Sequence, residues 1–581
     1  MIKGFLRFAR RVVILAVLAI IVMAISDYFT HRVANDSVLK VVLDGEVLER
    51  GHAGVLGAIG GGDYTALNLV RKAIQRAATD SRISGMALEV IDPEMQLAQA
   101  QEIAGLIGDF KNHGKWTTAY IESAGESSSG NLPYLAASAC GEVSMMPLGE
   151  LNLVGIQMRE LFARGALDWA GVVPNFHSIG EYKSAANLFT EKEFTAAQRE
   201  QDESLIDSLF EQLVAQIAKQ RGISPQGVTA LVDRAPMNSD AGLKSHLLDR
   251  VEYGDEFEER VKKWGGGSHK LIDYDVYVRP RMLSGFASGD RVAVVYGSGE
   301  IQRGSSDIDP LSAGAEAMDS DDMSDAFEQA REDDTVRAVV FRVDSPGGSV
   351  VASELIRRQV ELTAKQKPVV ISMSGYAASG GYWISTPAAK IFADGGTITG
   401  SIGVLGGKFN IAPMAAKLGV NSEAVSRGAN VSMFDQFTNF SPSQQALFEA
   451  QLNDAYQRFV NLVAKSRHLS FEETDSIAQG RVWTGMQALH LKLIDQIGDF
   501  NAALKEARAE AKLAPEEKVR LLELPREPGL IEKLLSGQLV AHTVVNPAIR
   551  SALAPMRDLV HAAIAARRGL IQSYCPRVPL M

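Results

Sequence analysis

Cysteine is nearly absent from this 581-residue chain, which contains only Cys140 and Cys575. Two cysteines are too few for a disulfide framework, and their spacing suits no metal site, so we expect no bound metal ion. The chain also lacks a long basic stripe, and its formal net charge is −11 at pH 7. An acidic chain without a basic surface is a poor partner for nucleic acid, and we expect it to bind none.

Histidine, the usual base beside a serine nucleophile, is absent from the motifs that could form an active site. The chain has 10 histidines, and none lies within the glycine-rich and serine-rich motifs described below. His177 comes nearest to such a motif, and its neighbours indicate a packing or surface residue. A serine nucleophile on this chain would therefore need a base other than histidine.

Long apolar runs are rare, and the most prominent one is at the N-terminus. Four cations at positions 3–11 precede an uncharged apolar run over residues 12–25. The run is short against the ~20 residues that span a bilayer, so both a cleaved signal peptide and an uncleaved anchor fit it. Residues 24–26 match a cleavage site poorly. We therefore favour a cytoplasmic basic flank and one transmembrane helix over residues 1–30, with the rest of the chain exported.

The chain repeats itself with a period of about 250 residues. The stretch 195–224 matches 441–470 without gaps, and Asp249 falls opposite Asp495. A chance match of this length is improbable. Each half is therefore predicted to be one copy of the same fold.

Within each half, β-rich runs alternate with helical segments. In the second half, residues 291–296, 338–343 and 369–373 are typical of strands, and residues 349–366 and 443–465 are typical of helices. Strands interleaved with helices of this length indicate βαβ units and a parallel sheet.

The repeat also predicts the domain layout of an α/β protein. We expect an N-terminal domain over residues 37–264 and a C-terminal domain over 291–521. A flexible linker over 265–290 would join them, because it begins with Gly-Gly-Gly-Ser. The tail, residues 522–581, has no visible counterpart in the first half and is expected to form short helices without a chemical role.

Ser379 stands where a predicted strand runs into a segment of small residues, 374–385. Small residues let the chain turn sharply and let a substrate backbone approach. A helix that begins there would bring free N–H groups beside the serine. The segment suits a presented nucleophile, but a glycine-rich packing turn with a capping serine explains it equally well.

A second glycine-rich turn, residues 344–348, follows another predicted strand. The N–H groups of Gly347 and Gly348 could point at one spot, which suits the oxyanion that forms during acyl transfer. Phosphate binding is the competing use of such a turn. The segment has neither a Walker lysine nor a Gly-x-Gly-x-x-Gly pattern, so phosphate is disfavoured.

Lys183, in a segment of small and aromatic residues, is the candidate base. A free lysine has a pKa of ~10.4, and burial can lower that value by several units. A lone lysine is nearly always a solvated surface residue, but the repeat favours a role here. Lys183 falls opposite Val431, and Ser379 falls near Ser129, where the double glycine is lost. One half keeps the lysine and the other keeps the serine, as one site divided between two domains would.

Taken together, these motifs resemble those of the signal peptide peptidase A (protease IV) family in its long form with two tandem domains. The resemblance covers nearly the whole chain and is carried by residues 182–184, 344–348, 376–387, 399–403 and 480–485. It implies two ClpP/crotonase-like domains, the first carrying the lysine and the second the serine. It also implies a serine endopeptidase that cleaves signal-peptide remnants and other hydrophobic peptides.

The resemblance further assigns roles to individual residues. Ser379 would be the nucleophile and Lys183 the general base, while the hydroxyl of Ser401 would orient the lysine amine. Gly347 and Gly348 would form the oxyanion hole. The family implies a homotetramer held by its anchor in the inner (cytoplasmic) membrane, with its domains on the periplasmic side and no cofactor.

The sequence leaves the role of three aromatic residues undecided, and it allows two other functions. Tyr376, Tyr382 and Trp383 would suit an apolar peptide groove, although plain core packing explains them as well. A crotonase-like acyl-CoA enzyme is one alternative function, and a membrane-anchored scaffold with a vestigial site is the other. The predicted export of the chain argues against the first, because CoA is cytoplasmic.

Overall fold

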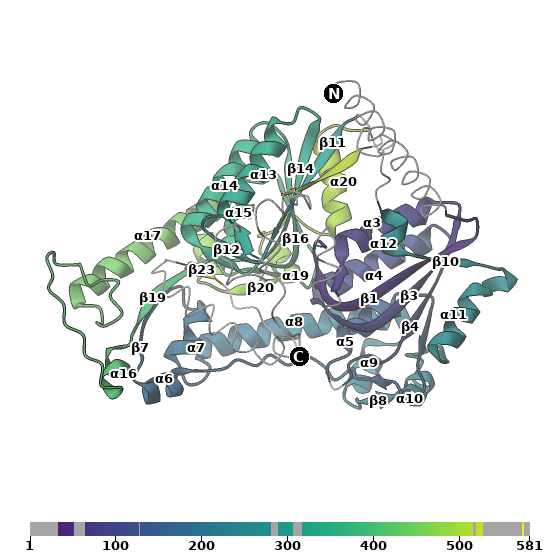
Figure 1. The fold of residues 1–581 in the computed structure, drawn as a ribbon, viewed down its shortest axis with the longest axis horizontal. Helices are drawn as coiled ribbons and strands as arrows, with labels where there is room; N and C mark the ends of the chain where they lie inside the picture. The colour runs from purple at the N-terminus through teal and green to yellow at the C-terminus, as the bar shows by residue number, and fades with distance from the viewer. Residues whose placement is uncertain are drawn as a thin grey trace, which may run out of the picture.

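The computed structural model describes residues 33–51, 64–126, 128–279, 289–305, 317–514, 519–526 and 572–574. The predicted membrane anchor, residues 1–30, lies outside these ranges. Among the described helices, none combines the length and the apolar character that crossing a membrane requires. Two sheets with packed helices make up the molecule, one from each half of the chain, and a third sheet contains strands of both halves (Figure 1).

The first sheet is parallel and has the strand order β10-β1-β3-β4-β5-β9, with β2 paired to β1. Its strands are β1 (Ser37–Leu48), β2 (Tyr64–Ala66), β3 (Ile83–Glu94), β4 (Trp116–Ile121), β5 (Glu142–Met145), β9 (Arg250–Val251) and β10 (Lys270–Asp273). Helices α3 (Leu67–Thr79) and α4 (Leu97–Asn112) connect its first strands. Because β1, β3 and β4 are buried on both faces, they consist largely of apolar residues, as strands of a covered parallel sheet do.

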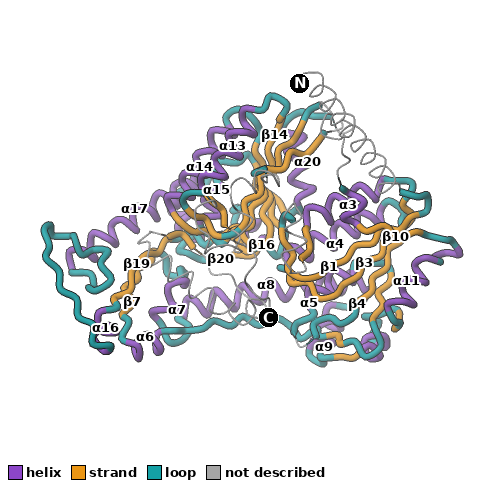
Figure 2. The backbone as a smooth tube through the Cα atoms, viewed as in Figure 1, coloured by secondary structure: helices purple, strands orange, loops and turns teal. Residues whose placement is uncertain are grey.

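The second sheet repeats this order as β22-β11-β14-β16-β17-β21, all parallel, and adds β18 and β20 beyond the end of β16. Its strands are β11 (Arg291–Ser298), β14 (Val336–Ser345), β16 (Val369–Ala378), β17 (Lys390–Ala393), β18 (Ile398–Gly400), β20 (Val482–Thr484), β21 (Gln496–Ile497) and β22 (Arg520–Leu524). Figure 2 shows the strands of the two sheets as separate groups. The predicted duplication and the α/β fold are therefore confirmed.

Equivalent residues make the same hydrogen bonds in both halves. Asp249 accepts a hydrogen bond from the backbone N–H of Val143, and Asp495 accepts one from that of Ile391, each at 2.8 Å. The long helices α8 (Ala196–Arg221) and α17 (Pro442–Arg467) also correspond, and each begins at a hydroxyl cap. The predicted strands and helices of the second half are present, with bounds shifted by a few residues.

Two described segments near the predicted domain boundaries form strands that the sequence did not predict. Lys270–Asp273, inside the predicted linker, forms strand β10, which pairs with the start of β1. Arg520–Leu524, which crosses the predicted boundary between the C-terminal domain and the tail, forms β22, which pairs with the start of β11 in the same way. In the described part of the tail we find strands where we expected short helices. Each strand pairs with an otherwise exposed edge of a sheet. Because this pairing depends on the sheet rather than on the short segment itself, the sequence of the segment shows no strand pattern.

A third sheet joins the halves, with the strand order β13-β12-β15-β23-β19-β7. Its strands are β7 (Val173–Ile179), β12 (Glu300–Gln302), β13 (Ala317–Asp319), β15 (Gly347–Ser349), β19 (Val404–Asn410) and β23 (Gln572–Tyr574). Strand β7 of the first half lies antiparallel to β19 of the second through seven residue pairs (Figure 1).

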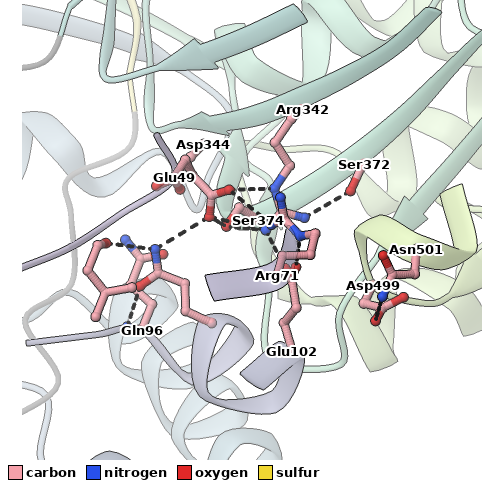
Figure 3. A network of polar contacts seen from close by, with 12 residues as sticks. Glu49, Arg71, Gln96, Glu102, Arg342, Asp344, Ser372, Ser374, Asp499 and Asn501 are labelled. Carbon is pink, nitrogen blue, oxygen red and sulfur yellow. Dashed lines mark hydrogen bonds and ion pairs between the residues drawn. The ribbon is translucent and has the colours of Figure 1, made fainter. Parts of the chain in front are cut away.

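A buried charge network also connects the halves (Figure 3). Arg342 on β14 donates to Glu49, which follows β1, at 2.7 Å, and to Glu102 on α4 at 2.6 Å. Arg71 on α3 donates to Glu102 at 2.5 Å. All four side chains are at most 3 % exposed. Two cations therefore balance two carboxylates in a site that is closed to water.

The pKa of Glu49 reflects this arrangement. Burial alone would raise it, but the charge and hydrogen bonds of Arg342, with a smaller contribution from Arg71, lower it to about 2. Because the pKa is lowered in the folded chain, the contribution of Glu49 to stability is present at neutral pH. It is lost as the pH falls from the ordinary value of 4.5 toward 2.

We predict that Arg342→Leu destabilises the chain, because it leaves two carboxylates buried without their shared partner. Breaking a buried pair in this way costs about 3–5 kcal/mol. Calorimetry should show a clear fall in the midpoint of thermal unfolding. Arg358→Leu is the matched control. Arg358 is half exposed, and its ion pair with Glu361 lies at the surface. Equal midpoints for the two variants would contradict a stabilising role for the network.

Candidate active site

Ser379 stands between the end of β16 and a short helix, α15 (Gly380–Ser385). Its backbone has φ 57° and ψ −115°, a conformation that non-glycine residues rarely adopt. The N–H of Ser379 donates to the carbonyl of Gly400 at 2.8 Å, and its own carbonyl accepts from Trp383 at 2.9 Å. These bonds hold a strained backbone in one place, which is common at functional sites.

The glycines that follow Ser379 are required by close packing. A Cβ at Gly380 would lie 2.6 Å from the hydroxyl of Ser353, and one at Gly381 would lie 2.7 Å from the carbonyl of Ser345. Two side chains here would push the serine away from the neighbouring strand. The small residues noted in the sequence therefore have a steric reason.

Lys183 comes four residues after the end of β7, in a tight turn. Its N–H donates to the carbonyl of Gly180 at 3.1 Å, and the N–H of Tyr182 donates to the carbonyl of Gln479 at 2.8 Å. The turn of the first half thus rests on a loop of the second half. Gly480 has φ 75°, and a Cβ there would lie 2.6 Å from the Cβ of Lys183. Only glycine leaves room for the lysine at this point.

The strand pair β7–β19 brings the lysine to the serine. Ile179, at the end of β7, lies opposite Val404, at the start of β19. Lys183 follows the end of β7 and Ser401 precedes the start of β19. The two residues therefore meet at the same end of the strand pair. The Nζ of Lys183 lies 2.8 Å from Ser379 Oγ, 3.0 Å from Ser401 Oγ and 3.1 Å from the Ser401 carbonyl oxygen. These residues belong to a single chain.

The contacts of the lysine amine suit both of its protonation states. A charged amine can donate to all three oxygens, whereas a neutral one donates two protons and accepts a third through its lone pair. In the neutral state, the two oxygens of Ser401 would take the donated bonds, and the hydroxyl of Ser379 would donate to Nζ. Lys183 is 3 % exposed and Ser379 is 0 % exposed. Burial of this degree favours the neutral form of an amine.

Gly347 and Gly348 form the short strand β15, where the sequence suggested only a turn. Their φ angles are 102° and 154°. A Cβ at Gly348 would lie 2.2 Å from the carbonyl oxygen of Ile301, so the close approach of β12 requires glycine here. The N–H of Gly347 donates to Ser345 Oγ at 3.2 Å. A Cβ on Gly380 would lie 3.2 Å from the N of Gly348, so the glycine pair is next to the turn that holds Ser379.

For two of the candidate aromatic residues the structure decides between the groove and the core that the sequence left open. Tyr382 and Trp383 are both 0 % exposed and belong to the core of the second half. The Tyr382 hydroxyl donates to the carbonyl of Leu493, and the Trp383 ring N–H donates to Glu354. They form core rather than a peptide groove, because the helix that follows Ser379 turns them inward. His177 pairs with Glu449 at 3.1 Å, as expected of a surface residue.

The loop 479–481 is part of the site, but a search of the sequence for reactive side chains does not identify it. It supports Lys183 through Gly480, and the carbonyl of Arg481 accepts from the N–H of Ser401 at 2.7 Å. The Arg481 side chain in turn donates to Glu200 on α8 at 2.8 Å. The loop contributes backbone and space rather than reactive groups, and only its glycine in a shared motif could have indicated it.

Comparison with known proteins identifies the class. The chain is 32 % identical over 510 residues to "Protease 4" of Salmonella typhi, covering 84 % of this chain and 79 % of that protein. It is 31 % identical over 451 residues to "Protease 4" of Haemophilus influenzae, with 75 % and 71 % covered. It is 30 % identical over 517 residues to "Serine protease SPPA, chloroplastic" of Arabidopsis thaliana, with 88 % and 74 % covered. The chain is a serine-type endopeptidase.

The family is equally clear. The model of "Peptidase family S49" matches residues 109–265 and 361–514, one segment in each half of the repeat. The chain belongs to peptidase family S49. This membership confirms the resemblance drawn from the motifs and sets aside the acyl-CoA enzyme and the inert scaffold.

We predict that Gly480→Ala lowers kcat/KM by roughly 100-fold, because displacement of a reacting group by about 1 Å has effects of that order. The added Cβ would push Lys183 away from Ser379, and peptide hydrolysis measures the loss. Gly419→Ala is the matched control, since Gly419 has the same φ within a degree and open space around its Cβ. If both variants lost activity equally, backbone strain rather than the position of the lysine would be responsible.

Proposed function

We propose that this peptidase uses Ser379 as its nucleophile and Lys183 as its general base. It would cleave hydrophobic peptides, signal-peptide remnants among them, at the periplasmic side of the inner membrane. The observation that carries the proposal is the distance of 2.8 Å between Lys183 Nζ and Ser379 Oγ, buried together in one chain. Buried amines next to a serine hydroxyl can act as bases, because burial favours their neutral form.

The proposed reaction is acyl transfer in two stages. Neutral Lys183 takes the proton of Ser379 while Oγ attacks the peptide carbonyl. The N–H of Gly348 stabilises the resulting oxyanion. Gly347 contributes less, since its N–H already donates to Ser345 Oγ. The charged lysine then gives its proton to the leaving amine, and the acyl group stays on Ser379.

Deacylation would use the same groups in reverse. Lys183, neutral again, takes a proton from a water molecule that attacks the acyl carbonyl. When the second tetrahedral intermediate collapses, the lysine returns the proton to Ser379 Oγ. Ser401 keeps Nζ in line throughout, because both of its oxygens lie within 3.1 Å of the amine.

The wider architecture is part of the proposal. We assign the two halves to ClpP/crotonase-like domains, over residues 37–264 and 291–521, held at the membrane by an anchor within residues 1–30. The parallel sheets with equivalent strand orders support this assignment. The described residues of the tail include the end of strand β22 and all of strand β23.

An exposed apolar surface supports the proposed homotetramer. Helices α6 (Arg164–Ala170) and α16 (Ala412–Lys417) lie together beside β7 and β19 (Figure 1), where Lys417 donates to the carbonyl of Trp169 at 2.5 Å. Large apolar side chains are more than half exposed on these helices and the segments beside them, namely Leu161, Trp169, Leu418, Val420, Val425 and Phe434. Trp169 and Leu418, at the contact between the two helices, are 84 % and 74 % exposed, and large apolar side chains exposed together are typical of interaction surfaces.

We predict that Ser379→Ala and Lys183→Ala each abolish peptide cleavage, with a loss of at least about 1,000-fold. Lys183→Arg should be as inactive, since a guanidinium stays charged and cannot accept the proton. Hydrolysis of an apolar signal-peptide-like substrate measures the loss, and thermal unfolding checks each fold. Ser129→Ala is the control, because Ser129 is the aligned serine of the first half. Full activity in Lys183→Ala would mean that another group is the base.

We predict that Ser401→Ala lowers kcat by about 10–100-fold with little change in KM, because it removes one of the oxygens that hold Nζ. Ser401 has φ 50°, in the left-handed region that alanine disfavours as serine does, so the alanine variant keeps the backbone strain. Ser401→Gly would relieve that strain and still lack the hydroxyl. Steady-state kinetics should show the same fall in kcat for both variants. Recovery of activity in the glycine variant would assign the effect to the backbone.

A further inference from the structure

The guanidinium of Arg481 lies between two aromatic rings that belong to different halves of the chain. Its Cζ is 4.7 Å from the ring centre of Tyr182 and 4.5 Å from that of Trp483. Both distances are within the ~6 Å over which a cation is attracted to a ring face. Tyr182 directly precedes Lys183 in the first half, whereas Trp483 belongs to β20 of the second half. The side chain therefore bridges the halves beside the proposed base.

Glu200 on α8 adds a polar link to the same contact. Helix α8 of the first half lies beside β20 of the second (Figure 1). Glu200 accepts a hydrogen bond from Arg481 at 2.8 Å and another from the hydroxyl of Tyr182 at 3.2 Å. Its side chain is 59 % exposed, so the ion pair alone contributes little. The Nε of Arg481 has no hydrogen-bond partner among the described residues. The two rings are therefore the main support of the guanidinium.

The backbone beside this side chain supports the serine half of the site. The carbonyl of Arg481 accepts from the N–H of Ser401 at 2.7 Å. The next residue, Val482, pairs with Gly400 on β18, and the carbonyl of Gly400 accepts from the N–H of Ser379 at 2.8 Å. Arg481 thus contacts the turn of the proposed base through its side chain and the segment of Ser401 through its backbone.

We propose that Arg481 is a positioning residue for the peptidase reaction. Held between Tyr182 and Trp483, its guanidinium fixes the turn that places Nζ of the lysine on the serine hydroxyl. The inference rests on the proposed role of Lys183 as the base. Arg481 does not touch the reacting atoms and acts through Tyr182. A displacement of the base by about 1 Å lowers the rate of the chemical step up to about 100-fold, so the effect should fall on kcat.

The first test removes the side chain in the full chain. We expect Arg481→Ala to lower kcat for an apolar peptide by about 10- to 100-fold with little change in KM. Arg199→Ala is the matched control, because the exposed guanidinium of Arg199 lies over Phe194 at 5.3 Å and precedes Glu200 on the same helix. Thermal unfolding checks that both variants fold. An unchanged kcat in Arg481→Ala, or an equal fall in the control, would overturn the proposal.

The second test returns the guanidinium to the space that Arg481→Ala leaves between the rings. Methylguanidinium at millimolar concentration should restore at least about tenfold of the lost kcat, because a tethered group has an effective concentration in that range. Methylammonium is the control, since it is a compact cation without a planar face to lie against both rings. Equal recovery with the two cations would assign the effect to charge alone. Absence of any recovery would assign it to a rearranged loop, and either result would overturn the proposal.

A double-mutant cycle tests whether Arg481 acts through Tyr182. Tyr182→Leu removes the ring on the side of the base, and its kcat is compared with that of Arg481→Ala and of the double variant. We expect the double variant to match the lower single variant within about twofold, since residues that act through one contact are not additive. Losses that multiply would show independent effects and overturn the proposal.

Lys183→Ala, measured beside these variants, separates this inference from the proposed function. If Lys183→Ala is inactive and Arg481→Ala is fully active, the inference fails and the proposed function stands. If Lys183→Ala is fully active while Arg481→Ala is impaired, Arg481 positions another group. That outcome would overturn both proposals.

Discussion

The antiparallel pairing of β7 with β19 is the contact on which the active site depends. The lysine and the serine belong to different halves of the chain, and each half folds around its own parallel sheet. Seven residue pairs between β7 and β19 fix the register of one half on the other, so that the turn after Ile179 meets the turn before Val404. A slip of one residue would move Lys183 by about 3.3 Å and turn neighbouring side chains to the opposite face.

The buried charges of Glu49, Glu102, Arg71 and Arg342 complement this ladder. They join the halves at a different place, through residues of α3, α4 and β14 and the residue after β1 (Figure 3). A buried network of this kind tolerates few arrangements, because each charge needs its partner. The core supports the same register, since Tyr376, Ala378 and Ile398 of the second half pack into the apolar cluster of the first. Two contacts of different chemistry therefore hold Lys183 and Ser379 at the separation that the proposed mechanism needs.

The sequence predicted what is repeated or locally patterned and missed what pairs at long range. Strands such as β11, β14 and β16 could be predicted from their apolar runs, and Lys183 could be singled out because its aligned partner is Val431. The lysine and the serine meet as the divided-site hypothesis requires, while their catalytic roles stay a prediction. Strands β10, β22 and β23 could not be predicted, because a segment of three to five residues gains its structure from the edge that it joins. Tyr382 and Trp383 were ambiguous for a similar reason: a six-residue helix has no period long enough to show which way its rings face.

Dividing the proposed dyad between two halves would also set when activity can begin during synthesis. A ribosome makes the lysine half first, and domains tend to fold in the order in which they emerge. Until Ser379, Ser401 and the loop around Gly480 have followed, the lysine has no serine to activate. A chain that stops between the halves, by nonsense mutation or proteolysis, therefore carries the lysine without the serine of the proposed dyad.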